Sequence, residues 1–177
     1  MSQAREAPVR MGVGFDMHRL VSGRALILGG VTIPFERGLE GDSDADVLTH
    51  AIVDALLGAA GLGDIGAHFG VGRPENLGIS SLRLLDQVVR LVRAKGYRPG
   101  NVDATIVAEA PRLSSFIPEM RQGLACVLEM PEDRVNLKST TAKGLGALGA
   151  GEGIATFAVA TVIPVDASRE PRTESRE

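Results

Sequence analysis

The sequence predicts an α+β fold, an α/β sandwich in which one mixed β-sheet carries helices on one of its faces. Three observations lead to this prediction. Segments rich in β-branched residues are mixed along the chain with segments whose apolar residues recur at helical spacing. The length of 177 residues suits one domain. Only 3% of the residues are aromatic, so the core must be built from Val, Ile, Leu and Ala.

The expected strands are runs of β-branched residues that end at Gly or at polar clusters. Residues 9–18 (VRMGVGFDMH) and 25–33 (ALILGGVTI) are expected to pair as a hairpin through the connection VSGR. Further strands are expected at residues 101–110, 135–141 and 152–165. Together these segments supply the strands of one sheet.

Three helices are expected between these strands. Residues 43–62 place a run of Ser and Asp, suited to an N-cap, before apolar residues at helical spacing, and Gly61 and Gly63 close the helix. Residues 81–97 are amphipathic and end at Lys95-Gly96, and residues 116–130 carry a proline near their start. The polar ends, residues 1–9 and 167–177, lack any period and are expected to be disordered around a domain at 10–166.

Composition and charge exclude several classes of function. The formal net charge is −3, with no basic stripe and few aromatic residues for base stacking, which argues against nucleic acid as a partner. The chain contains neither a signal-peptide pattern nor an apolar run long enough to cross a membrane, so a cytoplasmic protein is expected. The single cysteine, Cys126, lies in the apolar sequence LACVLEM and is expected to be a buried thiol.

Two motifs point to a metal site. Asp16 and His18 flank one residue of a predicted strand, so both side chains point to the same face and could share one metal ion. The alternative is a solvated aspartate beside a hydrogen-bonded histidine. One carboxylate and two imidazoles, with His50 as the third ligand, are the ligand set of an open Zn²⁺ site, although Mn²⁺, Fe²⁺ or Co²⁺ would also suit it.

The helix that carries His50 also carries two carboxylates. Asp46, His50 and Asp54 are spaced four residues apart and lie on one stripe, where a carboxylate could orient the imidazole. Alternatively, Asp46 interacts with the helix N-terminus and Asp54 is an exposed charge. His68 is expected to be a hydrogen-bonded loop histidine without a part in the site.

A hydroxyl-rich strand end precedes a glycine-dense loop, KSTTAKGLGALGAGEGIA. Hydroxyl groups and unobstructed backbone N–H groups there could bind a diphosphate, and the residues concerned are Ser139, Thr140 and Thr141. The glycines could equally serve turns or subunit packing. Glu152 in this loop is either exposed or faces a symmetry axis.

These motifs resemble the 2-C-methyl-D-erythritol 2,4-cyclodiphosphate synthase family. The resemblance rests on GVGFDMHRL, on the segment at 29–69 that contains GDSDADVLTHAIVDALLGAAGLGDIGAHF, on NVDATIVAEAP, IPEMR and VNLKSTT, and on GEGIA. They occur in order from about Arg10 to Pro164. The resemblance implies a homotrimer with active sites between subunits and a Zn²⁺ held by Asp16, His18 and His50. The implied reaction is a lyase reaction of isoprenoid precursor biosynthesis that cyclises a CDP-linked phosphorylated alcohol and releases CMP.

The resemblance also implies substrate-binding residues. Asp64 and Gly66 would bind hydroxyl groups of the alcohol, and Ser43 would lie near its phosphate. The cytidine and its phosphates would be framed by Ala108, Pro111, Arg112, Leu113, Ser139, Thr140 and Thr141, with Arg112 in the place of the family's usual Lys.

Several positions depart from the family pattern. Asp42 replaces a His that binds the substrate phosphate, and Lys143 replaces the Glu that binds a second divalent ion such as Mg²⁺. We place both at the catalytic site. Val71 and Arg73 replace acidic residues of the substrate loop, and Ala150 replaces an Arg near the trimer axis.

The substitutions leave three interpretations open. The first is that the cyclase chemistry is retained, with Lys143 supplying charge near the phosphates. Alternatively, a diverged paralogue acts on another CDP-alcohol, with Asp42 binding a free hydroxyl. The third interpretation is a non-catalytic trimeric module that binds a cytidine nucleotide or an isoprenoid.

Overall fold

A five-stranded mixed sheet forms the centre of the molecule, in the strand order β4-β1-β7-β5-β6. The computed structural model describes residues 9–70 and 77–165. β1 (Arg10–Ser22) pairs antiparallel with β4 (Arg37–Leu39) and β7 (Gly153–Pro164). β7 is antiparallel to β5 (Tyr97–Val107), which is parallel to β6 (Val135–Thr140). The predicted α+β class with one mixed sheet is confirmed; the expectations for the two chain ends, for Val71 and for Arg73 fall outside the described residues.

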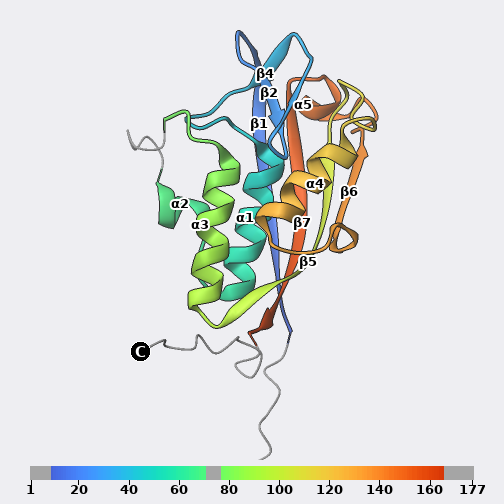
Figure 1. The fold of residues 1–177 in the computed structure, drawn as a ribbon. Coiled ribbons are helices and arrows are strands. Elements are labelled where there is room, and N and C mark those ends of the chain that lie inside the picture. Colours follow the sequence, from blue (N-terminus) through green and yellow to red (C-terminus); the bar gives the residue numbers. More distant parts are fainter. Residues whose placement is uncertain (1–8, 71–76, 166–177) are drawn as a thin grey trace, which may run out of the picture.

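Helices cover one face of this sheet, as Figure 1 shows. α1 (Val47–Ala60) packs on β1 and β7, α3 (Ser81–Ala94) packs on α1 and β5, and α4 (Ile117–Val127) packs on β6. Two short helices, α2 (Ile65–Phe69) and α5 (Gly146–Gly149), occupy segments expected to be loops, and the one-turn 3₁₀ helix η2 covers Glu132–Arg134. No helix within the described ranges is both long and apolar enough to serve as a membrane span.

The expected hairpin between residues 9–18 and 25–33 is wrong. β2 (Leu26–Leu28) and β3 (Val31–Ile33) pair with each other, and Gly29 and Gly30 form the turn with φ values of 57° and 76°. Two consecutive residues with positive φ are what a type I′ hairpin turn requires. β1 instead runs along β7, whose sequence lies at the other end of the domain. Local pattern identifies strands but does not say which strands pair.

Helix α1 is buried on nearly all sides. It begins at the N-cap Asp46 and ends at Gly61, which has a left-handed φ of 68°. Except for His50, Asp54 and Gly58, all residues of α1 are buried. This follows from its position between the sheet and α3.

Two glycines allow α1 to lie directly on β1. Gly12 and Gly14 face the helix, and a Cβ atom on Gly14 would lie 1.9 Å from the carbonyl oxygen of Ala51. A Cβ atom on Gly12 would lie 2.1 Å from the carbonyl oxygen of Ala55. Because strand side chains alternate, the same face of β1 continues with Asp16 and His18. The close approach therefore brings the α1 backbone next to both predicted metal ligands.

The opposite face of the sheet carries exposed apolar side chains. On β1 these are Met11, Val13, Phe15 and Met17, and on β7 Phe157. The rings of Phe15 and Phe157 lie 4.7 Å apart, and the two side chains are 48% and 54% exposed. A contiguous apolar patch of this kind marks an interaction surface. We call these five residues the open sheet face.

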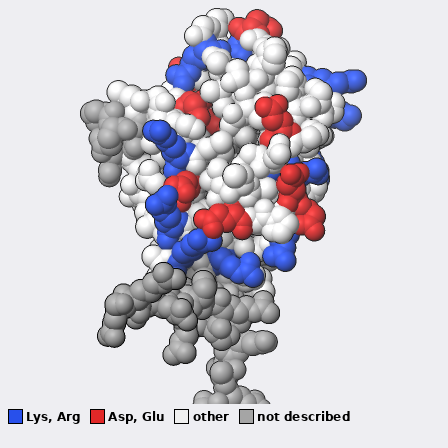
Figure 2. All heavy atoms as spheres, viewed as in Figure 1, with Lys and Arg blue, Asp and Glu red and all other residues white. Residues whose placement is uncertain are grey.

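The helical side of the molecule has a mixed charge distribution. Figure 2 shows basic side chains toward the lower part of this view, with acidic side chains among them. On α3, Arg90 pairs with Asp86 at 3.0 Å, and Arg93 pairs with Glu129. Pairs of this kind reduce any single-sign field on this side of the molecule.

Candidate metal and substrate site

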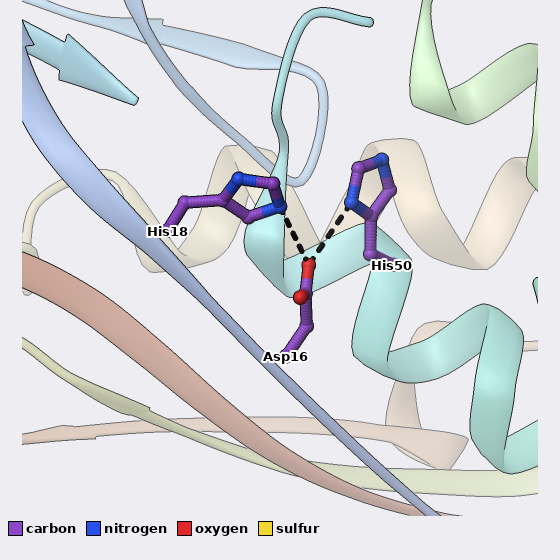
Figure 3. Close-up of side chains that lie close together, drawn as sticks. All are labelled: Asp16, His18 and His50. Carbon is purple, nitrogen blue, oxygen red and sulfur yellow. Dashed lines mark hydrogen bonds and ion pairs between the residues drawn. The ribbon is translucent and has the colours of Figure 1, made fainter. Parts of the chain in front are cut away.

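The candidate metal site combines one strand with one helix. Asp16 and His18 extend from the helix-facing side of β1, and His50 extends from α1 (Figure 3). The Asp16 Oδ2 atom is 2.9 Å from His18 Nε2 and 3.0 Å from His50 Nδ1. The three potential ligand atoms all lie within 4.8 Å of one another. The predicted ligand triad is therefore assembled in the structure.

The Asp16 carboxylate is held in its ionised form, which suits the binding of a cation. Burial raises the pKa of Asp16, but hydrogen bonds from His18 and His50 outweigh it and hold the pKa far below its ordinary value. Burial lowers the pKa of His18, and the hydrogen bond to Asp16 reverses this, so the net shift is upward. The carboxylate thus holds positive charge beside it. A divalent cation bound by the same lone pairs would supply that charge, so the residues fit a metal.

His18 is oriented by the backbone of the following loop. Its Nδ1 atom forms a short hydrogen bond with the carbonyl oxygen of Glu40. A carbonyl can only accept, so Nδ1 carries the proton in this bond. In the neutral ring, the lone pair then lies on Nε2, which faces Asp16. His18 is thus presented as an Nε2 ligand.

A cavity of about 370 Å³ lies in front of the triad. Its polar lining includes Asp42, Ser43 and Gly66, all of which were predicted from the sequence. The apolar part of the lining consists of Ile65, Phe69, Ile79 and Leu84. The cavity can accommodate a small molecule with a polar end against the triad and an apolar part against α2 and α3.

The loop that carries Asp42 and Ser43 is held by Arg24, which the sequence analysis did not identify. The guanidinium group of Arg24 donates to the carbonyl oxygen of Gly41 at 2.7 Å and to that of Ser43 at 2.6 Å. One planar cation thus clamps the backbone on both sides of Asp42. Nothing in the local sequence signals this contact, because three strands, β2, β3 and β4, separate Arg24 from the loop.

The remaining predicted substrate residues form a second cluster. Ala108, Pro111, Arg112 and Leu113 follow β5, and Ser139, Thr140 and Thr141 lie at the end of β6 or just after it. The parallel pairing places the ends of these strands side by side, with Ala108 N donating to the Thr140 carbonyl oxygen at 2.9 Å. None of the residues in this second cluster lines the cavity at the triad. Within one chain, the predicted site is divided in two.

Lys143 and Asp64 are not at the metal triad. Lys143 is exposed, has a positive φ of 55°, and lies in the loop after β6, where its N–H donates to Thr141 Oγ1 at 3.3 Å. Asp64 caps α2 by accepting from the N–H of Ala67 at 2.8 Å. Glu152 is exposed and lies 3.9 Å from Arg19, and Ala150 is the exposed C-cap of α5.

The two other carboxylates on the α1 stripe have structural roles. Asp46 accepts from Gly29 N, Gly30 N and both the N–H and the hydroxyl of Thr49, at 2.7 to 3.0 Å. Complete burial nevertheless raises the pKa of this carboxyl. Its bonds hold the β2–β3 turn against the start of α1 and do not orient His50. Asp54 accepts from Ile65 N at 2.7 Å, so it anchors α2 and is not a free surface charge.

Two expectations for single residues have different outcomes. His68 has its Nε2 atom 2.8 Å from the carbonyl oxygen of Leu62, so the prediction of a hydrogen-bonded histidine is confirmed, although the residue is in α2 and not in a loop. The prediction that Cys126 is buried is wrong, because this thiol is exposed near the end of α4. It lies on the helix surface away from the buried Leu124 and Ala125.

Comparison with known proteins identifies the family of this chain. The sequence pattern of the YgbB family matches residues 9–163. A 2-C-methyl-D-erythritol 2,4-cyclodiphosphate synthase from Gloeobacter violaceus is 58% identical over 151 residues, which cover 85% of this chain and 93% of that protein.

Solved structures show the same fold. The bifunctional IspDF from Campylobacter jejuni superimposes with a TM-score of 0.88 and 38% identity over 92% of this chain, which spans 44% of that longer protein. A CDP complex of IspF from Plasmodium falciparum superimposes with a TM-score of 0.79 and 33% identity, covering 89% of this chain and 97% of that one. This chain therefore belongs to the YgbB family, together with the 2-C-methyl-D-erythritol 2,4-cyclodiphosphate synthases.

Proposed function

We propose that the chain converts 4-diphosphocytidyl-2-C-methyl-D-erythritol 2-phosphate to 2-C-methyl-D-erythritol 2,4-cyclodiphosphate with release of CMP. The observation that carries this proposal is the triad of Asp16, His18 and His50 at the base of a cavity of about 370 Å³. Relatives that are 52% to 58% identical bear the name of this synthase. Their similarity favours this reaction over another CDP-alcohol and over a non-catalytic module.

The metal in this proposal is Zn²⁺. A carboxylate and two imidazoles leave at least one position open for a phosphate oxygen, which is typical of catalytic zinc sites. When bound, the ion supplies a Lewis acid that neutralises phosphate charge. Asp16, His18 and His50 would hold it, and Mn²⁺, Fe²⁺ or Co²⁺ would suit the same ligands.

The reaction requires the chain to position two phosphates more than to supply covalent chemistry. The 2-phosphate oxygen forms a bond to the β-phosphorus, and the bond from that phosphorus to the CMP oxygen breaks. We assign Ser43 to the phosphate end of the cavity, and Asp64 and Gly66 to the hydroxyl groups of the alcohol. Ile65, Phe69 and Leu84 would contact its carbon skeleton. Holding the reacting atoms in line accounts for much of such a rate enhancement.

The site is complete only between subunits of a homotrimer in this proposal. The second cluster, at the ends of β5 and β6, would bind the cytidine and its phosphates for a neighbouring subunit, and none of its residues lines the cavity of its own chain. The solved CDP complex of a relative supports a nucleotide of this kind. The open sheet face supplies an apolar surface suited to subunit contact.

Replacing Phe15 with glutamate should convert the trimer to monomers. The ring packs on Phe157 in the centre of the open sheet face, and a buried carboxylate without a partner there would oppose association. Sedimentation or light scattering measures the change, and CMP release should fall with it. Leu77→Glu is the matched control for the oligomeric state, because Leu77 is also exposed and apolar but precedes α3 and belongs to no strand of the sheet. A trimer that persists in Phe15→Glu would contradict the proposed interface.

Asp42 and Lys143 give this chain a different charge arrangement from the family pattern. Asp42 lines the cavity, where its carboxylate could accept a hydrogen bond from a substrate hydroxyl group. Lys143 lies beside Thr141 in the second cluster. We propose that its ammonium group supplies, at the phosphates of the CDP moiety, the positive charge that a second divalent ion would otherwise supply.

Lys143→Glu should therefore create a requirement for Mg²⁺. With Zn²⁺ alone, the expected CMP release falls about 100-fold, since a cation that stabilises developing charge has been reversed in sign. Added Mg²⁺ should restore most of the rate. Lys95→Glu, which reverses a charge at the C-cap of α3, is the control and should change neither rate nor metal requirement. A Lys143→Glu variant with the unchanged rate in Zn²⁺ alone would contradict this role.

The proposed function itself is tested by incubating the purified chain with the proposed substrate in Zn²⁺, with and without Mg²⁺. The expected products are CMP and the cyclic diphosphate, and a chelator should stop their formation. If the chain binds CDP and Zn²⁺ but releases no CMP, the proposed reaction is wrong, and Asp42 becomes the first residue to consider for a changed substrate.

A further inference from the structure

A buried hydroxyl group lies behind the metal ligand His50. Ser81, the first residue of α3, is fully buried, and its Oγ atom is 2.9 Å from His50 Nε2. This is the ring nitrogen that faces away from Asp16, because Nδ1 is the atom 3.0 Å from the Asp16 carboxylate. Ser81 therefore contacts the ligand on the side opposite the metal position.

A carboxylate holds Ser81 in turn. Asp44 Oδ1 accepts a short hydrogen bond from the Ser81 hydroxyl, and Asp44 Oδ2 accepts from the Ser81 N–H at 2.9 Å. The Asp44 backbone N–H donates to the carbonyl oxygen of Ile79 at 3.1 Å, and Asp44 Oδ1 also accepts from Asp46 N at 3.3 Å. The carboxylate is thus fixed by donors from both the loop and the start of α3.

The contacts around Ser81 fix where two protons lie. An ionised carboxylate only accepts, so the single hydroxyl proton of Ser81 points to Asp44. The Ser81 oxygen can then only accept from His50, which places a proton on Nε2. In the structure without a metal, a proton on Nδ1 can still donate to Asp16. When a metal replaces that proton, the ring is neutral and the lone pair of Nδ1 points to the metal position. Ser43 Oγ, at 3.3 Å from Nε2, is a second and weaker acceptor.

We propose that Ser81 and Asp44 are positioning residues that keep His50 in the tautomer able to bind a metal through Nδ1. The inference rests on the metal site of the proposed function. It assigns to Ser81 and Asp44 a role that neither the sequence motifs nor the cavity lining indicated. The Glu40 carbonyl does the same for His18 through Nδ1, so both ligands have their tautomers set from behind.

Substitutions of Ser81 and Asp44 should lower Zn²⁺ affinity to different extents. In Ser81→Ala, Nε2 loses its acceptor at 2.9 Å but keeps Ser43 Oγ, so Zn²⁺ affinity should fall about 10-fold. In Asp44→Asn, we expect the amide oxygen to stay where it accepts the Ser81 N–H at 2.9 Å, because the competing Asp46 N–H contact is longer, at 3.3 Å. This turns the amide NH₂ toward the Ser81 hydroxyl. That hydroxyl then donates to Nε2 and favours the wrong tautomer. The expected loss is about 100-fold.

The double variant separates this mechanism from simple loss of packing. Removing the hydroxyl from Asp44→Asn also removes the misdirected proton, so Asp44→Asn/Ser81→Ala should bind Zn²⁺ about 10-fold more tightly than Asp44→Asn alone. If the two substitutions only damaged packing, their losses of Zn²⁺ affinity would add. A recovery of affinity in the double variant therefore indicates that the direction of the Ser81 hydroxyl proton is the cause.

The experiment is competition for Zn²⁺ against a chromophoric chelator, together with the ¹⁵N chemical shifts of the His50 ring in each zinc-free protein. Ser80→Ala is the matched control, since Ser80 adjoins Ser81 and its side chain forms no capping hydrogen bond. We expect unchanged Zn²⁺ affinity in Ser80→Ala, a loss of about 10-fold in Ser81→Ala and of about 100-fold in Asp44→Asn, and a partial recovery in the double variant. At high pH, the ¹⁵N shifts of His50 should indicate a proton on Nε2 in the unmodified chain and on Nδ1 in Asp44→Asn. Unchanged affinity in both single variants, or additive losses in the double variant, would overturn the proposal. Because none of these readouts requires turnover, inactivity toward the proposed substrate would leave the result interpretable.

Discussion

His50→Ala should abolish tight metal binding and lower CMP release by about 1000-fold or more. His50 is the only one of the three ligands contributed by a helix, and its Nδ1 atom completes the group around Asp16 Oδ2. The variant would keep only two ligands, the Asp16 carboxylate and the His18 imidazole. Both come from β1, and two ligands bind a divalent ion weakly. Metal content after dialysis and the rate of CMP formation measure the two effects.

The matched control for His50→Ala is His68→Ala. His68 is bound to the Leu62 carbonyl oxygen and belongs to no potential metal cluster in the described part of the chain. This variant should keep its metal content. Full metal content and activity in His50→Ala would rule out the triad as the metal site. Loss of metal in both variants would instead indicate a general effect on folding.

Gly14→Ala should destabilise the folded chain by about 3 kcal/mol or more, because the new methyl group has no space. Its Cβ atom would lie 1.9 Å from the carbonyl oxygen of Ala51 and 2.7 Å from the amide nitrogen of Ala55. Both are backbone atoms of α1, so the helix must move away from β1. Since α1 carries His50 and β1 carries Asp16, metal affinity should fall with stability.

Gly58→Ala provides a control at the same helix and strand. The nearest atoms to a Cβ on Gly58 are 4.0 Å away, and the residue lies inside α1. Alanine has a higher helix propensity, so a gain of up to about 1 kcal/mol is expected. Urea unfolding of both variants gives the two free energies. Equal effects of the two substitutions would mean that the close approach at Gly14 does not limit stability.

The meeting of Asp16, His18 and His50 was predictable because it depends on local periods. The two-residue period of a strand places Asp16 and His18 on one face, and the capping signals around 43–62 correctly indicated the helix that presents His50. The one tertiary contact that the triad needs in addition is the packing of this face of β1 on α1. Gly12 and Gly14 lie on the same face as Asp16 and allow this contact. They were a signal for it in the sequence, but the strand prediction used glycines only as signs that a strand ends.

Other parts of the site depend on contacts that no local pattern encodes. Asp46 was correctly placed at a helix start, but its bonds to Gly29 and Gly30 join segments far apart in sequence. Ser81 and Arg24 likewise reach the site through the tertiary fold. Only the family resemblance, which implies active sites between subunits, suggested that the substrate residues would be divided. No local pattern indicates this, because the second cluster depends on the pairing of β5 with β6.

The burial of α1 also limits which substitutions this helix can accept. A helix on a protein surface has a solvated side where substitutions cost little, but α1 has only His50, Asp54 and Gly58 outside the buried set. His50 is proposed to bind metal and Asp54 anchors α2. Gly58 is thus the one exposed position of the helix with neither task, and in a library of random substitutions we expect it to tolerate the widest range of side chains in α1.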